Sequence, residues 1–257
     1  AGVLDVAEGC WRFAHDKLRE VCLETILAED RPALHLRAAD GLEKAHAVNL
    51  TPHYAALAYH LQEGGEHIRA REFWTLAGDT SVTQFAHDDA LKYYGNALRL
   101  TPEDDHRIRY DLHLKRVNMS VRRSAIEIVE AILRDLAGEA AYLGDAERAT
   151  TALKAAQHAG SVSDYPTAEG RSLDAIQLAP DDDGLQIAAR IVLGESYHHR
   201  GRYEEADACF QEGYTIAKRR DWLNEQAHCL NNQGAWRYDA QLLDEARPFY
   251  REPRRPA

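Results

Sequence analysis

Thirteen histidines are the first residues in this 257-residue chain that suggest chemistry, because imidazole is a common metal ligand. His198 and His199 are adjacent, so on a helix their side chains point about 100° apart and cannot easily share one ion. His53 and His60 could share a helical face, but no cysteine or carboxylate cluster accompanies them, and the H-E-x-x-H motif is missing. We therefore predict no metal and no cofactor.

Acid–base and nucleophilic chemistry find little support either. The adjacent His15 and Asp16 are expected at the start of a helix, where a carboxylate accepts hydrogen bonds from free N–H groups. The acidic run 181–183 also precedes a predicted helix and lacks the EF-hand pattern. The sequence has neither a G-x-S-x-G elbow nor a G-x-x-x-x-G-K-[ST] phosphate loop. We predict that the chain is not an enzyme; a helical-solenoid enzyme is the least favoured alternative.

The four cysteines suggest structural thiols. Cys10, Cys22, Cys209 and Cys229 form no C-x-x-C pair, and their spacing does not resemble a disulfide framework. Cys22 and Cys209 occupy apolar positions of helical patterns. Buried, reduced thiols are typical of a cytoplasmic protein, which is the location we expect.

The formal net charge of −11 limits the classes of partner. Nucleic-acid binding needs a basic face, and the basic tail at 251–255 is too short to supply one. Anionic membrane surfaces are disfavoured too, and no apolar run approaches the roughly 20 residues that span a bilayer. We predict no direct nucleic-acid or membrane partner.

A pattern of three residues repeats along the chain. A small residue at position i is followed by another small residue at i+12 and by a residue that is often aromatic at i+16. The copies are Gly78/Ala90/Tyr94, Ala156/Ala168/Ser172, Gly194/Ala206/Phe210 and Gly234/Ala246/Tyr250, with a weaker one at Val117/Val129/Leu133. Two antiparallel helices approach closely only where both carry small side chains. We expect the side chain at the third position to fill the gap between its own helix pair and the next. One pair cannot bury its apolar face alone, so pairs must stack.

The copy at 189–217 carries a family resemblance. It reads Leu193-Gly194-x-x-Tyr197, followed by Gly201, Tyr203, Ala206 and Phe210, and it resembles the tetratricopeptide repeat. The resemblance covers roughly residues 66–251. It implies an all-α, right-handed superhelical α-solenoid in residues 64–257, with about five helix pairs, the last one truncated.

Residues 1–63 do not fit the repeat. Alternating apolar residues from Val3 to Phe13 predict a small β-hairpin, and a helix follows it. Asp30 and Pro32 predict the start of a second helix, which extends to about Ala47. Another helix should begin at 51–52 and end at 64–65.

The segment 11–20, Trp-Arg-Phe-Ala-His-Asp-Lys-Leu-Arg-Glu, resembles a recurring segment of large bacterial signalling ATPases of the STAND type. In that family it joins a winged-helix-like module to a tetratricopeptide array. The resemblance implies that residues 1–63 end such a module, with the ATPase before residue 1. We expect the chain to be a piece of a longer protein, since it lacks an initiator Met and its last helix runs into Pro253 and Pro256.

The resemblance also points to candidate binding residues. In tetratricopeptide arrays the first helix of each pair lines the concave face, which in the two last copies places Glu195, His198, Asn231 and Tyr238 there. Polar and aromatic groups at such positions could grip a peptide, while the alternative is a plain wetted surface.

Two functions follow. The first is a non-catalytic protein–protein interaction scaffold that binds a peptide or protein on the concave face. The second is a regulatory sensor arm that binds an effector or packs on other domains of the parent chain. We also expect some self-association through the exposed end of the solenoid.

Overall fold

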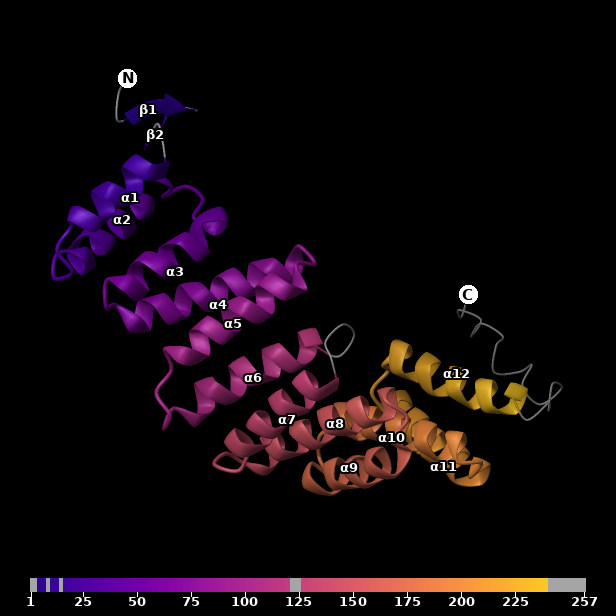
Figure 1. Cartoon of the computed structure of the whole chain (residues 1–257). Coiled ribbons are helices and arrows are strands. Elements are labelled where there is room, and N and C mark those ends of the chain that lie inside the picture. Colours follow the sequence, from indigo (N-terminus) through magenta and orange to yellow (C-terminus); the bar gives the residue numbers. More distant parts are fainter. Residues whose placement is uncertain (1–3, 8–9, 14–15, 121–125, 240–257) are drawn as a thin grey trace. The chain divides into compact units, whose positions relative to one another are not determined.

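The computed structural model describes residues 4–7, 10–13, 16–120 and 126–239 (Figure 1). These residues are predominantly helical, as an all-α solenoid requires. The chain divides into two compact units, Ala1–Pro102 and Glu103–Ala257. The right-handed course of the superhelix and the predicted boundary at residue 63 stay predictions.

The first unit begins with two short strands. β1 (Leu4–Ala7) pairs antiparallel with β2 (Cys10–Phe13), and Leu4 lies opposite Phe13. α1 (Asp16–Thr25) follows. The assignment of this segment to a winged-helix-like module stays a prediction.

Four α-helices and one 3-10 helix complete the described part of the first unit. They are α2 (Arg31–Ala45), η1 (Thr51–His53), α3 (Tyr54–Glu63), α4 (His67–Thr83) and α5 (His87–Arg99). α2 starts after Asp30 as predicted, although the Asp30 side chain makes no capping hydrogen bond. α3 ends at Gly64, and Gly65 has φ +87°, a left-handed conformation that suits glycine after a helix. From α2 to α5, each α-helix packs on the next.

The described part of the second unit contains three helix pairs and a further first helix. They are α6 (His106–Ser120), α7 (Ile126–Ala140), α8 (Asp145–Ser161), α9 (Tyr165–Leu178), α10 (Asp183–His199), α11 (Tyr203–Arg219) and α12 (Leu223–Asp239). α10 packs on its partner α11 and also on α9 and α8 of the preceding pair (Figure 1). Buried residues of α8, α9 and α10 form one cluster and those of α10, α11 and α12 form another, so α10 packs on both of its sides, as stacking of pairs requires.

Glycine at the first repeat position allows close packing within a pair. A Cβ atom built on Gly194 would lie 2.6 Å from Cε1 of Phe210, and one built on Gly78 would clash with the ring of Tyr94. The ring sixteen residues later therefore fills the space of the missing Cβ in its own pair. Our expectation that this ring serves the gap to the next pair was incomplete, because it overlooked this contact.

Most of the other repeat positions are buried. Fully or almost fully buried are Ala90, Ala156, Ala168, Ser172, Ala206 and Gly234, together with Val117, Val129 and Leu133 of the weaker copy. Tyr197 is half-buried, whereas Tyr203 is 39% exposed and contributes less to the core. Ala246 and Tyr250 lie outside the described residues.

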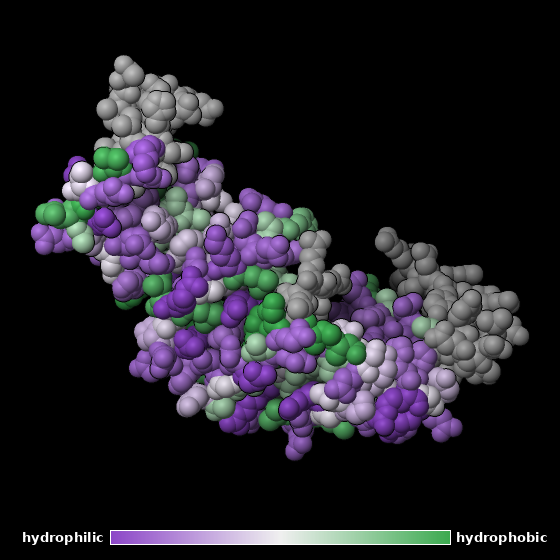
Figure 2. Space-filling view, in the orientation of Figure 1, coloured by the Kyte–Doolittle hydropathy of each residue, from purple (hydrophilic) through white to green (hydrophobic). Residues whose placement is uncertain are grey.

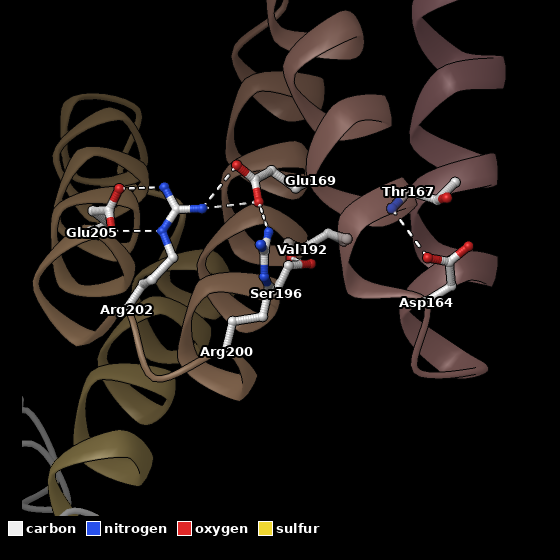
Figure 3. Close-up of polar contacts among 8 residues, drawn as sticks. All are labelled: Asp164, Thr167, Glu169, Val192, Ser196, Arg200, Arg202 and Glu205. Carbon is white, nitrogen blue, oxygen red and sulfur yellow. Dashed lines mark hydrogen bonds and ion pairs between the residues drawn. The ribbon is translucent and has the colours of Figure 1, made fainter.

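An ion-pair network fixes the turn between α10 and α11 (Figure 3). The guanidinium of Arg202 donates to Glu205 and, through Nη1, to both carboxylate oxygens of Glu169 on α9 at 3.0 Å. Arg200 donates to Glu169 as well, and the Arg202 guanidinium carbon lies 4.1 Å from the centre of the Tyr197 ring. Because these contacts join α9 to α11, they hold the C-terminal end of α10 in place.

The visible surface of the described residues is mainly hydrophilic, with hydrophobic residues in small groups (Figure 2). The described helices include none that is both long and apolar enough to cross a membrane.

Candidate functional site

The first helices of three successive pairs, α8, α10 and α12, line a groove of about 570 Å³. We call it the α8–α10–α12 groove. Its main polar and aromatic lining residues are Tyr165, Glu195, His199, Trp222, Glu225 and His228. Glu195 and His199 are four residues apart on α10 and Glu225 and His228 are three apart on α12, so each pair shares one helical face.

Glu195 is the half-buried carboxylate of this groove. Removal from water raises the pKa of Glu195, while nearby His228 and His199 and a hydrogen bond from Asn232 act in the opposite direction. That hydrogen bond, from Nδ2 of Asn232 to Oε1 of Glu195, is long at 3.5 Å. The carboxylate therefore keeps capacity to accept further hydrogen bonds from a ligand.

Aromatic rings lie at two places in the groove. The rings of Tyr165 and His199 stack with centroids 4.7 Å apart and planes inclined by 16°. Trp222, at the start of α12, is 38% exposed. Such faces pack against apolar or cationic groups of a ligand.

The predicted site residues are distributed unevenly over this groove. Glu195 lines it, whereas His198 does not: the His198 ring stacks with that of His199 and lies 5.8 Å from that of Tyr203. Asn231 is exposed and outside the lining, and its neighbour Asn232 makes the contact to Glu195. The side chain of Tyr238 lies outside the described residues.

Five of the six main polar and aromatic lining residues were not predicted from the sequence: Tyr165, His199, Trp222, Glu225 and His228. A four-residue step from Glu195, instead of the three-residue step to His198, reaches His199 on the same helical face. The repeat offsets held no comparable signal for Trp222, because it immediately precedes α12.

A second groove, of about 670 Å³, lies among α7, α8 and α9. Alanine side chains form much of its floor, and its charged lining residues carry both signs. Two of its arginines already have partners, since Arg148 pairs with Asp145 and Arg171 with Asp174, each at 3.3 Å. We favour the α8–α10–α12 groove because it combines a half-buried carboxylate with aromatic faces.

Four histidines of the first unit form two separate pairs. His46 and His53 stack with ring centroids 3.6 Å apart, and Nδ1 of His35 lies 3.0 Å from Nδ1 of His60. His53 and His60 thus take different partners and share no site with each other. The part of the chain that the structure describes contains no group of three or more potential metal ligands.

The two thiols with described side chains have little reactivity. Cys209 and Cys229 are not in disulfides. Burial raises the pKa of each to about 11, so the reactive thiolate is scarce at neutral pH. Both side chains lie outside the lining of the α8–α10–α12 groove.

Stacked helix pairs with small residues at their crossings, and a groove lined by successive first helices, form an α-solenoid whose fold is similar to a tetratricopeptide array. The sequence matches no known family model and no curated protein. In structure, the chain resembles a Signal Transduction ATPase with Numerous Domains (STAND) protein with a tetratricopeptide repeat sensor from Pyrococcus horikoshii, with a TM-score of 0.61 and 14% identity. The match covers 96% of this chain but only 43% of that protein. The chain also resembles BtubC (BKLC) from P. vanneervenii, with a TM-score of 0.58, 15% identity and coverage of 90% of this chain and 97% of the other.

Proposed function

We propose that this chain is a non-catalytic interaction module that binds an extended peptide segment of a partner in the α8–α10–α12 groove. The observation that carries the proposal is the groove itself, in which Glu195, two histidines and aromatic rings come from consecutive repeats. Its volume of about 570 Å³ lies within the usual range of ligand sites, roughly 300–1,000 Å³. Regularly spaced polar groups suit the repeating donors and acceptors of a peptide backbone.

The hydroxyl group of Ser196 in the groove is not arranged for catalysis, which agrees with a binding role. Ser196 lines the groove, but its hydroxyl donates to the carbonyl oxygen of Val192 at 2.8 Å (Figure 3). This hydroxyl is therefore engaged with the backbone of its own helix, whereas a catalytic serine needs a base that accepts its proton.

A second candidate function is a regulatory sensor arm. The structural likeness to a STAND protein with a tetratricopeptide repeat sensor favours it. In this case the same groove holds an effector or a neighbouring domain of a longer chain. Deletion of residues 64–257 from the parent protein should then change its nucleotide exchange or its output, and an unchanged output would count against the sensor role.

Selection from a phage-displayed random peptide library tests the peptide-binding proposal. Gly160 lines the groove on α8, and a Cβ atom built there meets no atom within 4 Å. A Gly160→Tyr side chain should therefore occupy the groove without disturbing the helix. Gly170 on α9 is exposed, has equally open surroundings and lies outside the groove, so Gly170→Tyr is the matched control.

The proposal predicts that selected peptides bind the wild type and Gly170→Tyr equally and lose affinity for Gly160→Tyr. Equal binding to all three proteins would place the site elsewhere, for example in the α7–α8–α9 groove. Circular dichroism of the three proteins should be the same, which ensures that any lost affinity reflects a blocked groove.

A further inference from the structure

The formally charged side chains that line the α8–α10–α12 groove are all acidic. Its formally charged side chains are Glu195 and Glu225, and the described lining contains neither lysine nor arginine. The α7–α8–α9 groove differs, since its lining includes Arg134, Arg148 and Arg171. A ligand of the α8–α10–α12 groove therefore meets two carboxylates, with the imidazoles of His199 and His228 but no lysine or arginine beside them.

Among the described residues Glu195 has no ion pair with a lysine or arginine, although His228 and His199 lie near enough to lower its pKa. Among the described residues its carboxylate has one hydrogen-bond contact, the 3.5 Å contact with the neutral amide of Asn232. Half-buried carboxylates elsewhere in this unit are paired; Glu139, for example, accepts from Arg109 at 2.6 Å and contacts His106 at 2.9 Å. A charge held away from water without an ion pair is costly, and an incoming cation would offset that cost.

The aromatic groups around Glu195 suit the same ligand. The Tyr165 ring stacks on His199, four residues after Glu195, and Trp222 contributes a partly exposed indole. Lysine and arginine side chains combine an apolar stem with a cationic head, so they can pack on such rings while the head reaches a carboxylate.

We propose that the α8–α10–α12 groove recognises a basic segment of its peptide partner and seats a lysine or arginine side chain against Glu195. The inference rests on the proposed peptide-binding function and names the chemistry of its partner. Glu225 adds negative charge along the groove, and the rings of Tyr165 and Trp222 contact the aliphatic stem. The acidic net charge of the chain, −11, attracts a basic segment from a distance.

Fluorescence anisotropy with two labelled dodecapeptides tests this inference. In one probe serine alternates with lysine, and in the other serine alternates with glutamine. The variants are Glu195→Gln, which keeps the size of the side chain and removes its charge, and Gly160→Tyr, which blocks the groove. Glu204→Gln is the matched control, because Glu204 is exposed on α11 and lies outside the groove.

The inference predicts tighter binding of the Ser/Lys probe than of the Ser/Gln probe. Glu195→Gln should weaken the Ser/Lys probe by about tenfold or more, the usual scale of a hydrogen bond to a charged group. Glu204→Gln should change it less than about twofold, as expected of an exposed charge. Raising the salt concentration should weaken the wild type more than Glu195→Gln, because screening acts on the charge that the variant lacks.

Two failures have different meanings. The proposed basic partner is wrong if the Ser/Lys probe binds Glu195→Gln as tightly as it binds the wild type. It is also wrong if the probe binds neither protein while library-selected neutral peptides bind the wild type and lose affinity for Gly160→Tyr. In both cases the groove remains the proposed peptide-binding site. If neither the probes nor the library-selected peptides are sensitive to Gly160→Tyr, peptide binding in this groove is wrong as well.

Discussion

Gly194 shows how a missing side chain sets the distance between two helices. The ring of Phe210, which is 1% exposed, occupies the space that a Cβ atom on Gly194 would need. Phe210 is rigidly enclosed, so it cannot move away from an added methyl group without disturbing the core. The same relation holds between Gly78 and Tyr94, so two copies of the repeat use it.

Gly194→Ala should therefore destabilise the protein by about 1–3 kcal/mol, measured as the free energy of unfolding in urea. The matched change Gly170→Ala, at an exposed helical glycine with open surroundings, should be neutral or stabilise by up to ~1 kcal/mol. Equal effects at the two glycines would contradict the close packing of α10 on α11.

His113 on α6 should make stability depend on pH. The side chain is 3% exposed, and neither ring nitrogen has a hydrogen-bond partner among the described residues. Burial is the main cause that lowers the pKa of His113; Arg116 and Arg109 lower it further, while Asp135 and Glu139 act in the opposite direction. The unfolded chain then takes up a proton at a higher pH than the folded chain does. The free energy of unfolding therefore has the full contribution of neutral His113 above pH 6.5, and this contribution decreases as the pH falls below 6.5.

His113→Leu should remove this acid sensitivity. We expect the melting temperature of the wild type to fall between pH 7.5 and 5.5 more than that of the variant. At pH 7.5 the variant should be as stable as the wild type or more stable, by up to ~1 kcal/mol, because leucine leaves no buried polar atom unpaired. An unchanged pH dependence in the variant would contradict the account.

At the scale of a helix, capping explains the acidic run before α10. Oδ1 of Asp182 accepts a hydrogen bond from the backbone N–H of Leu185 at 3.0 Å, and Asp183 pairs with Arg220 at 2.5 Å. The sequence predicted the capping role of the run. It could not predict the ion pair, because Arg220 comes from the far end of α11, 37 residues later.

Asp182→Ala should cost about 1 kcal/mol, the usual value of a lost N-cap. Asp181→Ala is the matched control, since Asp181 is exposed and lies outside the helix, and it should change the free energy of unfolding by less than about 0.5 kcal/mol. Urea unfolding curves of both variants measure the difference. A larger effect at Asp181 would contradict the assignment of the cap.

The helix pairs were more predictable from the sequence than the groove was. Repeat offsets identify the faces that pack, since Ala206 and Phe210 must meet Gly194 whatever lies outside the core. The polar lining of the groove on α10, Glu195 and His199, lies on a face next to that of Gly194, where steps of three and four residues are equally compatible with the sequence. Only the rotation of α10 against α8 and α12 decides that His199 lines the groove and His198 does not.

At the scale of the whole molecule, the packing is local along the chain. Each helix of the second unit contacts its neighbours in sequence and, at most, a helix of the adjacent pair. In such arrays stability is close to a sum over repeats and their interfaces. A fragment of residues 103–257 should therefore fold by itself, with a cooperative urea transition followed by circular dichroism. A fragment without such a transition would show that the second unit depends on the first.

Hydroxyl-radical footprinting with a library-selected peptide can show whether the α8–α10–α12 groove is the peptide-binding site. Trp222 in the groove and Tyr203 outside it are 38% and 39% exposed, so they start from nearly equal accessibility. If the groove is the site, the peptide should protect Trp222, Tyr165 and His199 from oxidation, while Tyr203 and the exposed Tyr142 react as before. Protection of Tyr203 or Tyr142 with no change at Trp222 would contradict this prediction.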